Sequence, residues 1–218
     1  MTIRATLWDF GGVILESPFD AFTRYEQDHG LPAGFLRRLN ATDPDTNAWA
    51  RMERSEVSMA EFGRAFEAEA AAAGHRVDAH AVLALLSGGV RPEMVEAVRR
   101  CAARLPTGLV TNNFVGFGDG TGGAHAAADS PAAEIAEVLA LFDVIIESSR
   151  VGVRKPDPRI YELACESLGA RPAETVFLDD LGVNLKPARA MGMVTIKVVD
   201  PATALTELEA AVGFPLRD

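Results

Sequence analysis

The segment RATLWDFGGVIL, from Arg4 to Leu15, is the most informative part of this sequence. It opens with a short apolar run that ends in a single acid, Asp9, and continues after one aromatic residue with Gly11 and Gly12. Open α/β sheets build active sites from buried strands that carry a polar group at the carboxyl end, followed by a tight turn that favours glycine. An aspartate near a turn is also a common helix cap, so Asp9 alone leaves both interpretations open. The segment therefore predicts a first strand that ends in a candidate catalytic acid.

The composition is that of a folded protein with an excess of acid. Of the 218 residues, 48% are hydrophobic and 24% are charged, which suits one domain with a modest insertion. The net charge of −10 argues against nucleic acid or an anionic membrane surface as the main partner. The sequence shows neither a signal-peptide pattern nor an apolar run long enough to cross a bilayer, so we expect a cytoplasmic protein. Cys101 and Cys165 lack the spacing of metal ligands and are expected to be buried thiols.

The residues after this first segment show the spacing of helices instead of strands. Apolar residues recur at helical intervals in the stretches 19–30, 32–39, 46–54, 59–73 and 78–86. Ser58 and Glu61 have the spacing of a capping box at the start of the fourth stretch. No strand pattern interrupts these stretches, so we predict that residues 16–89 form a helical cap. Residues 1–15 and 90–218 are expected to form one α/β core.

The second half of the chain alternates between helices and strands. Strands are predicted at 108–111, 142–147, 175–178 and 194–198. Helices are predicted at 91–105, 132–139, 157–168, 184–191 and 202–211. Such alternation requires right-handed crossovers and a parallel sheet, so the predicted fold class is α/β: a three-layer Rossmann-like core whose small all-helical cap follows the first strand. The Gly-rich stretch 114–131 matches the spacing of a dinucleotide fingerprint, but no packed helix follows it, and we predict a loop that could cover the site.

Polar side chains stand at or just after the carboxyl ends of four predicted strands. These ends share one edge of a parallel sheet, so residues that are distant in the sequence can meet there. The candidates in chain order are Asp9, Thr111, Asn112, Lys155, Asp179, Asp180 and the helix-opening Asn184. Each alone is more often part of a turn, a solvated charge or a helix cap. Their occurrence together, in order and at strand ends, predicts one active site.

These motifs resemble those of the haloacid dehalogenase superfamily, whose phosphatases open with Asp-x-Asp-Gly-Thr/Val. Asp9 matches the nucleophile of that motif and Gly12 its glycine, while Gly11 stands where the phosphatases keep a second aspartate. Residues 142–196 are also similar to the phosphatase-like amino-terminal domains of soluble epoxide hydrolase and acyl-CoA dehydrogenase family member ten. The resemblance implies a Rossmann-like core with a small cap. It also implies a Mg²⁺-dependent hydrolase of small phosphorylated metabolites that works through an aspartyl-phosphate intermediate.

The resemblance implies a magnesium site at this edge of the sheet. Mg²⁺ is a hard cation that prefers carboxylate and carbonyl oxygens. The expected ligands are the side chains of Asp9 and Asp180 and the carbonyl oxygen of Gly11, with Asp179 beside them. An ion held there would neutralise negative charge between Asp9 and a phosphoryl group.

The remaining candidates are expected to act on the phosphoryl group. Asp9 would attack phosphorus and hold the group covalently, which divides one difficult hydrolysis into two steps. Lys155 would neutralise the charge that develops on the group. The Thr111 hydroxyl and the amides near Asn112 would donate hydrogen bonds to its oxygens, and Asn184 would support the acidic pair.

Gly11 removes the side chain that protonates the leaving group and activates water in the related phosphatases. Such general acid–base catalysis typically contributes about 10²–10⁴ in rate. Three functions stay open: a Mg²⁺-dependent phosphatase restricted to good leaving groups, a non-catalytic phosphate-ligand-binding or interaction domain, and a 2-haloacid dehalogenase-type hydrolase, because halide leaves without a proton donor. We favour the phosphatase, because the other motif residues are all present. The expected partner is a small phosphorylated substrate, and the expected state is a monomer or homodimer.

Overall fold

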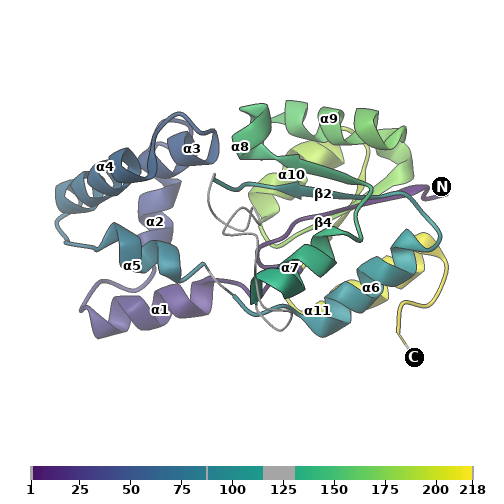
Figure 1. Cartoon of the computed structure of the whole chain (residues 1–218), viewed down its shortest axis with the longest axis horizontal. Coiled ribbons are helices and arrows are strands. Elements are labelled where there is room, and N and C mark those ends of the chain that lie inside the picture. The colour runs from purple at the N-terminus through teal and green to yellow at the C-terminus, as the bar shows by residue number, and fades with distance from the viewer. Residues whose placement is uncertain (1, 87, 115–130, 218) are drawn as a thin grey trace.

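A five-stranded parallel sheet forms the centre of the computed structural model, which describes residues 2–86, 88–114 and 131–217 (Figure 1). The strands lie in the order β3-β2-β1-β4-β5. Their bounds are Ala5–Trp8 for β1, Thr107–Thr111 for β2, Val144–Glu147 for β3, Thr175–Asp179 for β4 and Val194–Lys197 for β5. The strand that precedes Asp9 therefore lies in the middle of the sheet, and the predicted α/β fold class is confirmed.

Helices cover both faces of the sheet. One face packs against α6, α7 and α11, and the other packs against α9 and α10. The bounds of these helices are Pro92–Ala102, Pro131–Leu139, Pro201–Val212, Pro158–Leu168 and Gly182–Ala190 respectively. Successive residues of a strand point to opposite faces. Trp8 therefore packs with the apolar residues of α6, α7 and α11, and Leu7 packs with those of α9 and α10. Burial on both faces explains why β1 has a continuous apolar sequence.

The described residues between β1 and α6 form helices that pack on one another (Figure 1). These helices are α1 (Phe19–Asp28), α2 (Phe35–Ala41), α3 (Ala48–Glu53), α4 (Met59–Ala72) and α5 (Ala79–Ala84). Their apolar side chains form a cluster of their own around Phe62 and Phe66, whose rings stack with centroids 5.3 Å apart. Ser58 and Glu61 form the predicted capping box at the start of α4. The helical segment therefore has a core separate from those of the sheet, and we refer to it as the cap.

The chain enters and leaves the cap side by side. Leu15 and Val90 form an antiparallel bridge, and the Glu16 amide donates to the Gly89 carbonyl oxygen at 2.8 Å. A Cβ atom on Gly88 would come within 2.7 Å of the Glu16 carbonyl oxygen, so only glycine permits this close approach. We propose this bridge as the boundary between core and cap.

Two short elements of the structure have no counterpart in the sequence-based prediction. They are α8 (Ser148–Val151) and the 3₁₀ helix η1 (Pro172–Glu174). Segments of this length are too short to show a helical period. Some predicted ends are also too long: α6 ends at Ala102 instead of residue 105, because helix ends carry only weak local signals.

Three further expectations concern surfaces and side chains. The predicted loop 114–131 falls mostly outside the described residues, so its predicted covering of the site stays a prediction. In the described part of the chain, no helix has the length and apolar character needed to span a bilayer. Cys101 and Cys165 are free and buried, as the sequence predicts.

Candidate active site

The carboxyl edge of the sheet brings two acids and a lysine into direct contact. Asp9 follows β1, Asp179 ends β4, and Lys155 lies in the loop between α8 and α9. The Lys155 Nζ atom lies 2.7 Å from Asp9 Oδ1 and 2.7 Å from Asp179 Oδ2. All three side chains are buried, so these ion pairs are shielded from water. Three candidates that are distant in the sequence therefore meet at one point.

Burial and charge act against each other in this cluster. Removal of Lys155 from water opposes its charge, but Asp179 and Asp9 outweigh that effect and raise the pKa of the lysine. Burial raises the pKa of Asp9 well above its usual value, although Lys155 acts in the opposite direction. A second cation beside Asp9 would lower this pKa and favour the carboxylate that nucleophilic attack requires.

Asp179 is held in place by hydrogen bonds to both of its oxygens. The Leu181 amide donates to Oδ1 at 2.8 Å, and Asn184 Nδ2 lies 3.0 Å from each oxygen. Asn184 is fixed in turn by Tyr161, whose hydroxyl donates to the Asn184 carbonyl oxygen at 2.7 Å. Lys155 also contacts Oδ2, so Asp179 holds the lysine that faces Asp9.

Asp180 faces the turn that follows β1. A Cβ atom on Gly12 would collide with Asp180 Oδ2, and the φ of +75° at Gly12 lies in the left-handed region that favours glycine. Burial, followed by the negative charge of Asp179, raises the pKa of Asp180 to about 6. Asp9, Asp179 and Asp180 each offer a carboxylate oxygen, and these oxygens lie within 4.8 Å of one another. A group of hard oxygen atoms at this spacing fits Mg²⁺.

Asn112 holds the segment of Lys155 from the side of β2. Its Oδ1 atom accepts a hydrogen bond from the Lys155 amide at 2.8 Å, and its Nδ2 atom donates to the Lys155 carbonyl oxygen at 3.0 Å. From the sequence we expected backbone amides near Asn112 to donate hydrogen bonds to the phosphoryl oxygens. The contact between the Asn112 side chain and the backbone of Lys155 was not expected. Thr111 is half-buried at the end of β2, in register with Glu147 of β3.

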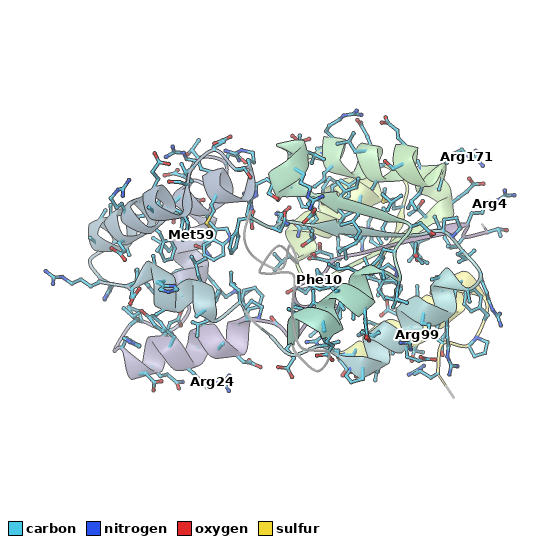
Figure 2. The ribbon with its side chains drawn as sticks, in the orientation of Figure 1. Arg4, Phe10, Arg24, Met59, Arg99 and Arg171 are labelled. Atoms are coloured by element: carbon cyan, nitrogen blue, oxygen red, sulfur yellow. The ribbon has the colours of Figure 1, made fainter. Side chains whose placement is uncertain are left out.

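Gly11 lies on the exposed side of the turn. A Cβ atom built there would meet no heavy atom of the described residues within 4 Å. Phe10, which precedes it, lies where the cap meets the core (Figure 2). Among the described residues, nothing blocks the start of an acidic side chain at position 11. The site lacks an acid there only because the residue is glycine.

The sequence did not single out three charged residues near this site. Arg91 Nη1 donates to the carbonyl oxygen of Gly12 at 3.1 Å. Arg154 Nε lies 2.6 Å from Glu53 Oε2, which joins the core to the cap. Arg154 could have been identified from the sequence, because it directly precedes Lys155. Glu53 could not, because it is one of several acids in the cap and no motif marks it.

A surface hollow of about 470 Å³ lies at the opposite edge of the sheet. Its lining includes Arg104, Asp143 and Ser167, which stand near the strand starts. The polar motifs stand instead at the strand ends, where open parallel sheets bind their ligands. We therefore place the candidate active site at the carboxyl edge.

The fold and this edge together define a capped α/β enzyme whose candidate nucleophile is an aspartate. The sequence model of the haloacid dehalogenase-like hydrolases matches residues 3–192, and the chain belongs to this family of hydrolases. The resemblance stated from the motifs is thereby confirmed.

Relatives and solved structures agree with this membership. The chain is 36% identical to acyl-CoA dehydrogenase family member 10 of Mus musculus over 98% of its own length and 19% of that protein. It is 34% identical to bifunctional epoxide hydrolase 2 of Mus musculus over 99% of its own length and 40% of that protein, so it spans less than half of either relative. A solved haloacid dehalogenase family enzyme of Bacteroides thetaiotaomicron, in complex with magnesium and inorganic phosphate, aligns with a TM-score of 0.58. Its identity of 20%, over 89% of this chain and 93% of that chain, shows the shared fold alone.

Replacing Lys155 by methionine is expected to lower the free energy of unfolding by about 3–5 kcal/mol, the usual cost of leaving a buried charge without its partner. Methionine fills similar space but leaves the buried carboxylates of Asp9 and Asp179 without a cation. Urea unfolding in the presence of EDTA, followed by circular dichroism, measures the change.

The matched control is Lys186→Met, because Lys186 is exposed on α10. Substitutions at such surface positions usually change stability by at most about 0.5 kcal/mol. Equal losses in the two variants would contradict the stabilising contact between Lys155 and the two acids.

Proposed function

We propose that the chain is a Mg²⁺-dependent phosphatase of small phosphorylated metabolites that works through an aspartyl-phosphate intermediate. The observation that carries this proposal is the 2.7 Å contact between Lys155 Nζ and Asp9 Oδ1. It sets a cation directly beside a carboxylate at a strand end, where a phosphoryl dianion needs positive charge to approach. Membership of the hydrolase family supports this chemistry, as does the fold shared with an enzyme solved with magnesium and inorganic phosphate.

Asp9, Asp180 and the carbonyl oxygen of Gly11 would hold the Mg²⁺ ion. Three acids and one lysine leave an excess of negative charge at this edge, which a divalent cation would balance. Bound there, Mg²⁺ supplies the positive charge that lets a phosphoryl dianion come close to a carboxylate. Asp179 lies outside this ligand set, because its oxygens already accept hydrogen bonds.

The reaction would proceed in two displacements at phosphorus. In the first, an Asp9 oxygen bonds to phosphorus, and the bond to the leaving oxygen breaks with its electron pair departing on that oxygen. Lys155 neutralises charge on the phosphoryl oxygens, and the Thr111 hydroxyl donates a hydrogen bond to one of them. In the second, a water oxygen bonds to phosphorus, the bond to Asp9 breaks with its electron pair returning to the carboxylate, and both water protons leave on the released dihydrogen phosphate.

The glycine at position 11 restricts the substrates of this reaction. It supplies no proton to the leaving oxygen in the first step and accepts none from water in the second. Acyl and aryl phosphates release anions that are stable without a proton, whereas alkyl phosphates do not. We therefore assign acyl and aryl phosphates as the favoured substrate class.

A panel of alkyl, aryl and acyl phosphates, assayed for phosphate release with Mg²⁺ and with EDTA, tests the proposal. The expected result is Mg²⁺-dependent release from the acyl and aryl members and little release from the alkyl members. Two results would count against a metal-dependent phosphatase: equal phosphate release with Mg²⁺ and with EDTA, or no phosphate release from any member of the panel.

The same samples also distinguish the proposed phosphatase from two other functions. A non-catalytic phosphate-binding domain would gain thermal stability from phosphate and Mg²⁺ without forming product. A dehalogenase-type hydrolase would release chloride when 2-chloropropionate is added to the panel. Neither function needs a proton donor at position 11, so both are compatible with Gly11.

A further inference from the structure

The cap contacts the core at a second place, remote from the bridge between residues 15 and 90. There α3 lies beside α8 (Figure 1). The Ser55 hydroxyl, just beyond α3, donates to the Ser149 carbonyl oxygen of α8 at 2.9 Å. We call this contact the polar bridge, and its members are Pro44, Glu53, Ser55, Ser149 and Arg154.

Glu53 and Arg154 form the charged centre of the polar bridge. Besides its 2.6 Å contact with Arg154 Nε, the Glu53 carboxylate accepts a hydrogen bond from Trp49 Nε1 at 3.0 Å. Arg154 Nη1 donates to the Pro44 carbonyl oxygen at 2.7 Å. Glu53 is only 7% exposed, and burial raises the pKa of its carboxyl while Arg154 opposes that rise. Separation of the cap from the core would break this ion pair and the hydrogen bond from Arg154 to Pro44, contacts that only the closed arrangement makes.

Two residues with a left-handed backbone stand on the cap side of the polar bridge. Among the described residues, the non-glycine residues with positive φ are Asp43 at 46° and Ser55 at 58°. Asp43 precedes the carbonyl group that Arg154 binds, and Ser55 follows Glu53 closely in the sequence. Ser55 follows the end of α3, where the Glu56 amide donates to the Arg51 carbonyl oxygen at 2.9 Å, so its left-handed backbone belongs to the helix C-cap. This conformation places the Ser55 hydroxyl against the Ser149 carbonyl oxygen of the core.

The core side of the polar bridge leads directly to the site. Arg154 reaches the cap, and the next residue, Lys155, reaches Asp9. Asn112 binds the amide and the carbonyl group of Lys155 from the core. The short segment that carries the lysine is therefore held by Asn112 on one side and by Glu53, through Arg154, on the other.

We propose that Glu53 is a positioning residue that couples closure of the cap to phosphoryl binding at Lys155, by way of Arg154. The inference rests on the proposed function, because it takes a phosphoryl group as the ligand. Coupling between two sites is reciprocal: a phosphoryl group bound at Lys155 favours the closed cap, and loss of the polar bridge weakens phosphoryl binding by the same factor.

Binding of inorganic phosphate to the full chain in the presence of Mg²⁺, measured by calorimetry, tests this coupling. Glu53→Gln keeps the size of the side chain and removes its charge. Glu56→Gln makes the same change in an exposed ion pair with Arg54 and serves as the matched control. We expect Glu53→Gln to weaken phosphate binding about fivefold or more, the lower end of usual coupling between sites, and Glu56→Gln to leave it unchanged. Equal binding by the two variants overturns the inference.

A double-mutant cycle separates an effect through Arg154 from a general loss of structure. If Glu53 acts through Arg154, Arg154→Gln weakens binding as Glu53→Gln does, and the double variant binds no more weakly than either. Losses that add in the double variant overturn the inference. The double variant contains no unpaired buried charge, so its comparison with the wild type still decides the question where a single variant does not fold: phosphate binding as tight as that of the wild type overturns the inference.

Trp49 reports on the polar bridge without any phosphate. The chain has two tryptophans, and the other, Trp8, is fully buried in the core. Loss of the Glu53 carboxylate is expected to raise the acrylamide quenching of Trp49 fluorescence, and Glu56→Gln is not. Unchanged quenching in Glu53→Gln overturns the polar bridge itself. A second outcome is raised quenching in Glu53→Gln while the wild type binds no phosphate. That outcome supports the polar bridge but overturns both the coupling and the proposed function.

Discussion

Replacing Gly11 by aspartate is expected to raise kcat for alkyl phosphates by about 10²–10⁴, the usual contribution of general acid–base catalysis. Within the part of the chain that the structure describes, the position has room for the new side chain, because it is exposed and a Cβ atom there meets no heavy atom within 4 Å. The carboxyl group can protonate the leaving oxygen and later accept a proton from the attacking water. Steady-state phosphate release from an alkyl phosphate with Mg²⁺, compared between Gly11→Asp and the wild type, measures the gain.

The matched control for this gain is Gly11→Asn, whose amide has the shape of the carboxyl group but exchanges no proton at neutral pH. The gain should be largest for alkyl phosphates and small for acyl phosphates, because only poor leaving groups need a proton. An equal gain in Gly11→Asn, or no gain in Gly11→Asp, would show that position 11 has no acid–base role.

Asp9→Asn is expected to lower turnover by at least about 10⁴, the scale observed when a catalytic nucleophile is removed from an enzyme. An amide oxygen is neutral and does not form a bond to phosphorus as a carboxylate does. The substitution also removes the negative charge that faces Lys155 Nζ at 2.7 Å. The turnover of both proteins is measured with an acyl phosphate. This substrate is expected to react fastest with the wild type, so the largest loss of turnover can be detected with it.

Asp20→Asn is the control for this variant, because Asp20 is an exposed acid in the first turn of α1. We expect it to keep full turnover. Mass spectrometry after acid quenching should find a phosphoryl group on the wild-type chain during turnover and none on Asp9→Asn. Turnover that survives in Asp9→Asn would refute an aspartyl-phosphate intermediate.

The elements around the first strand could be predicted because their signals are local. Burial of β1 on both faces produces its apolar run, and the left-handed backbone at Gly12 beside Asp180 requires the glycine that ends the turn. The cap helices likewise show their period within their own residues. The short helix α8 could not be predicted in this way, because four residues do not complete two turns.

The candidate residues of the site could also be identified, but not the division of work between them. Asp179 and Asp180 are neighbours of the same type, and only the resemblance to the family separates them, by implying that Asp180 is the ligand. The structure also separates them: Asp179 is enclosed by Asn184 and Lys155, whereas Asp180 is turned toward Gly12. Packing therefore sets Asp179 against the lysine and Asp180 against the turn at Gly12.

Local patterns in the chain establish the alternation of strands and helices, the place of Asp9, Thr111 and Asp179 at strand ends, and the glycine at position 11. Tertiary structure alone decides that Lys155 contacts Asp9, that Asn112 holds the backbone of that lysine, and that Glu53 of the cap pairs with Arg154. The physical reason is distance. A hydrogen bond or ion pair forms only when two polar atoms come within about 3 Å, and for side chains on different elements only the folded chain determines that separation.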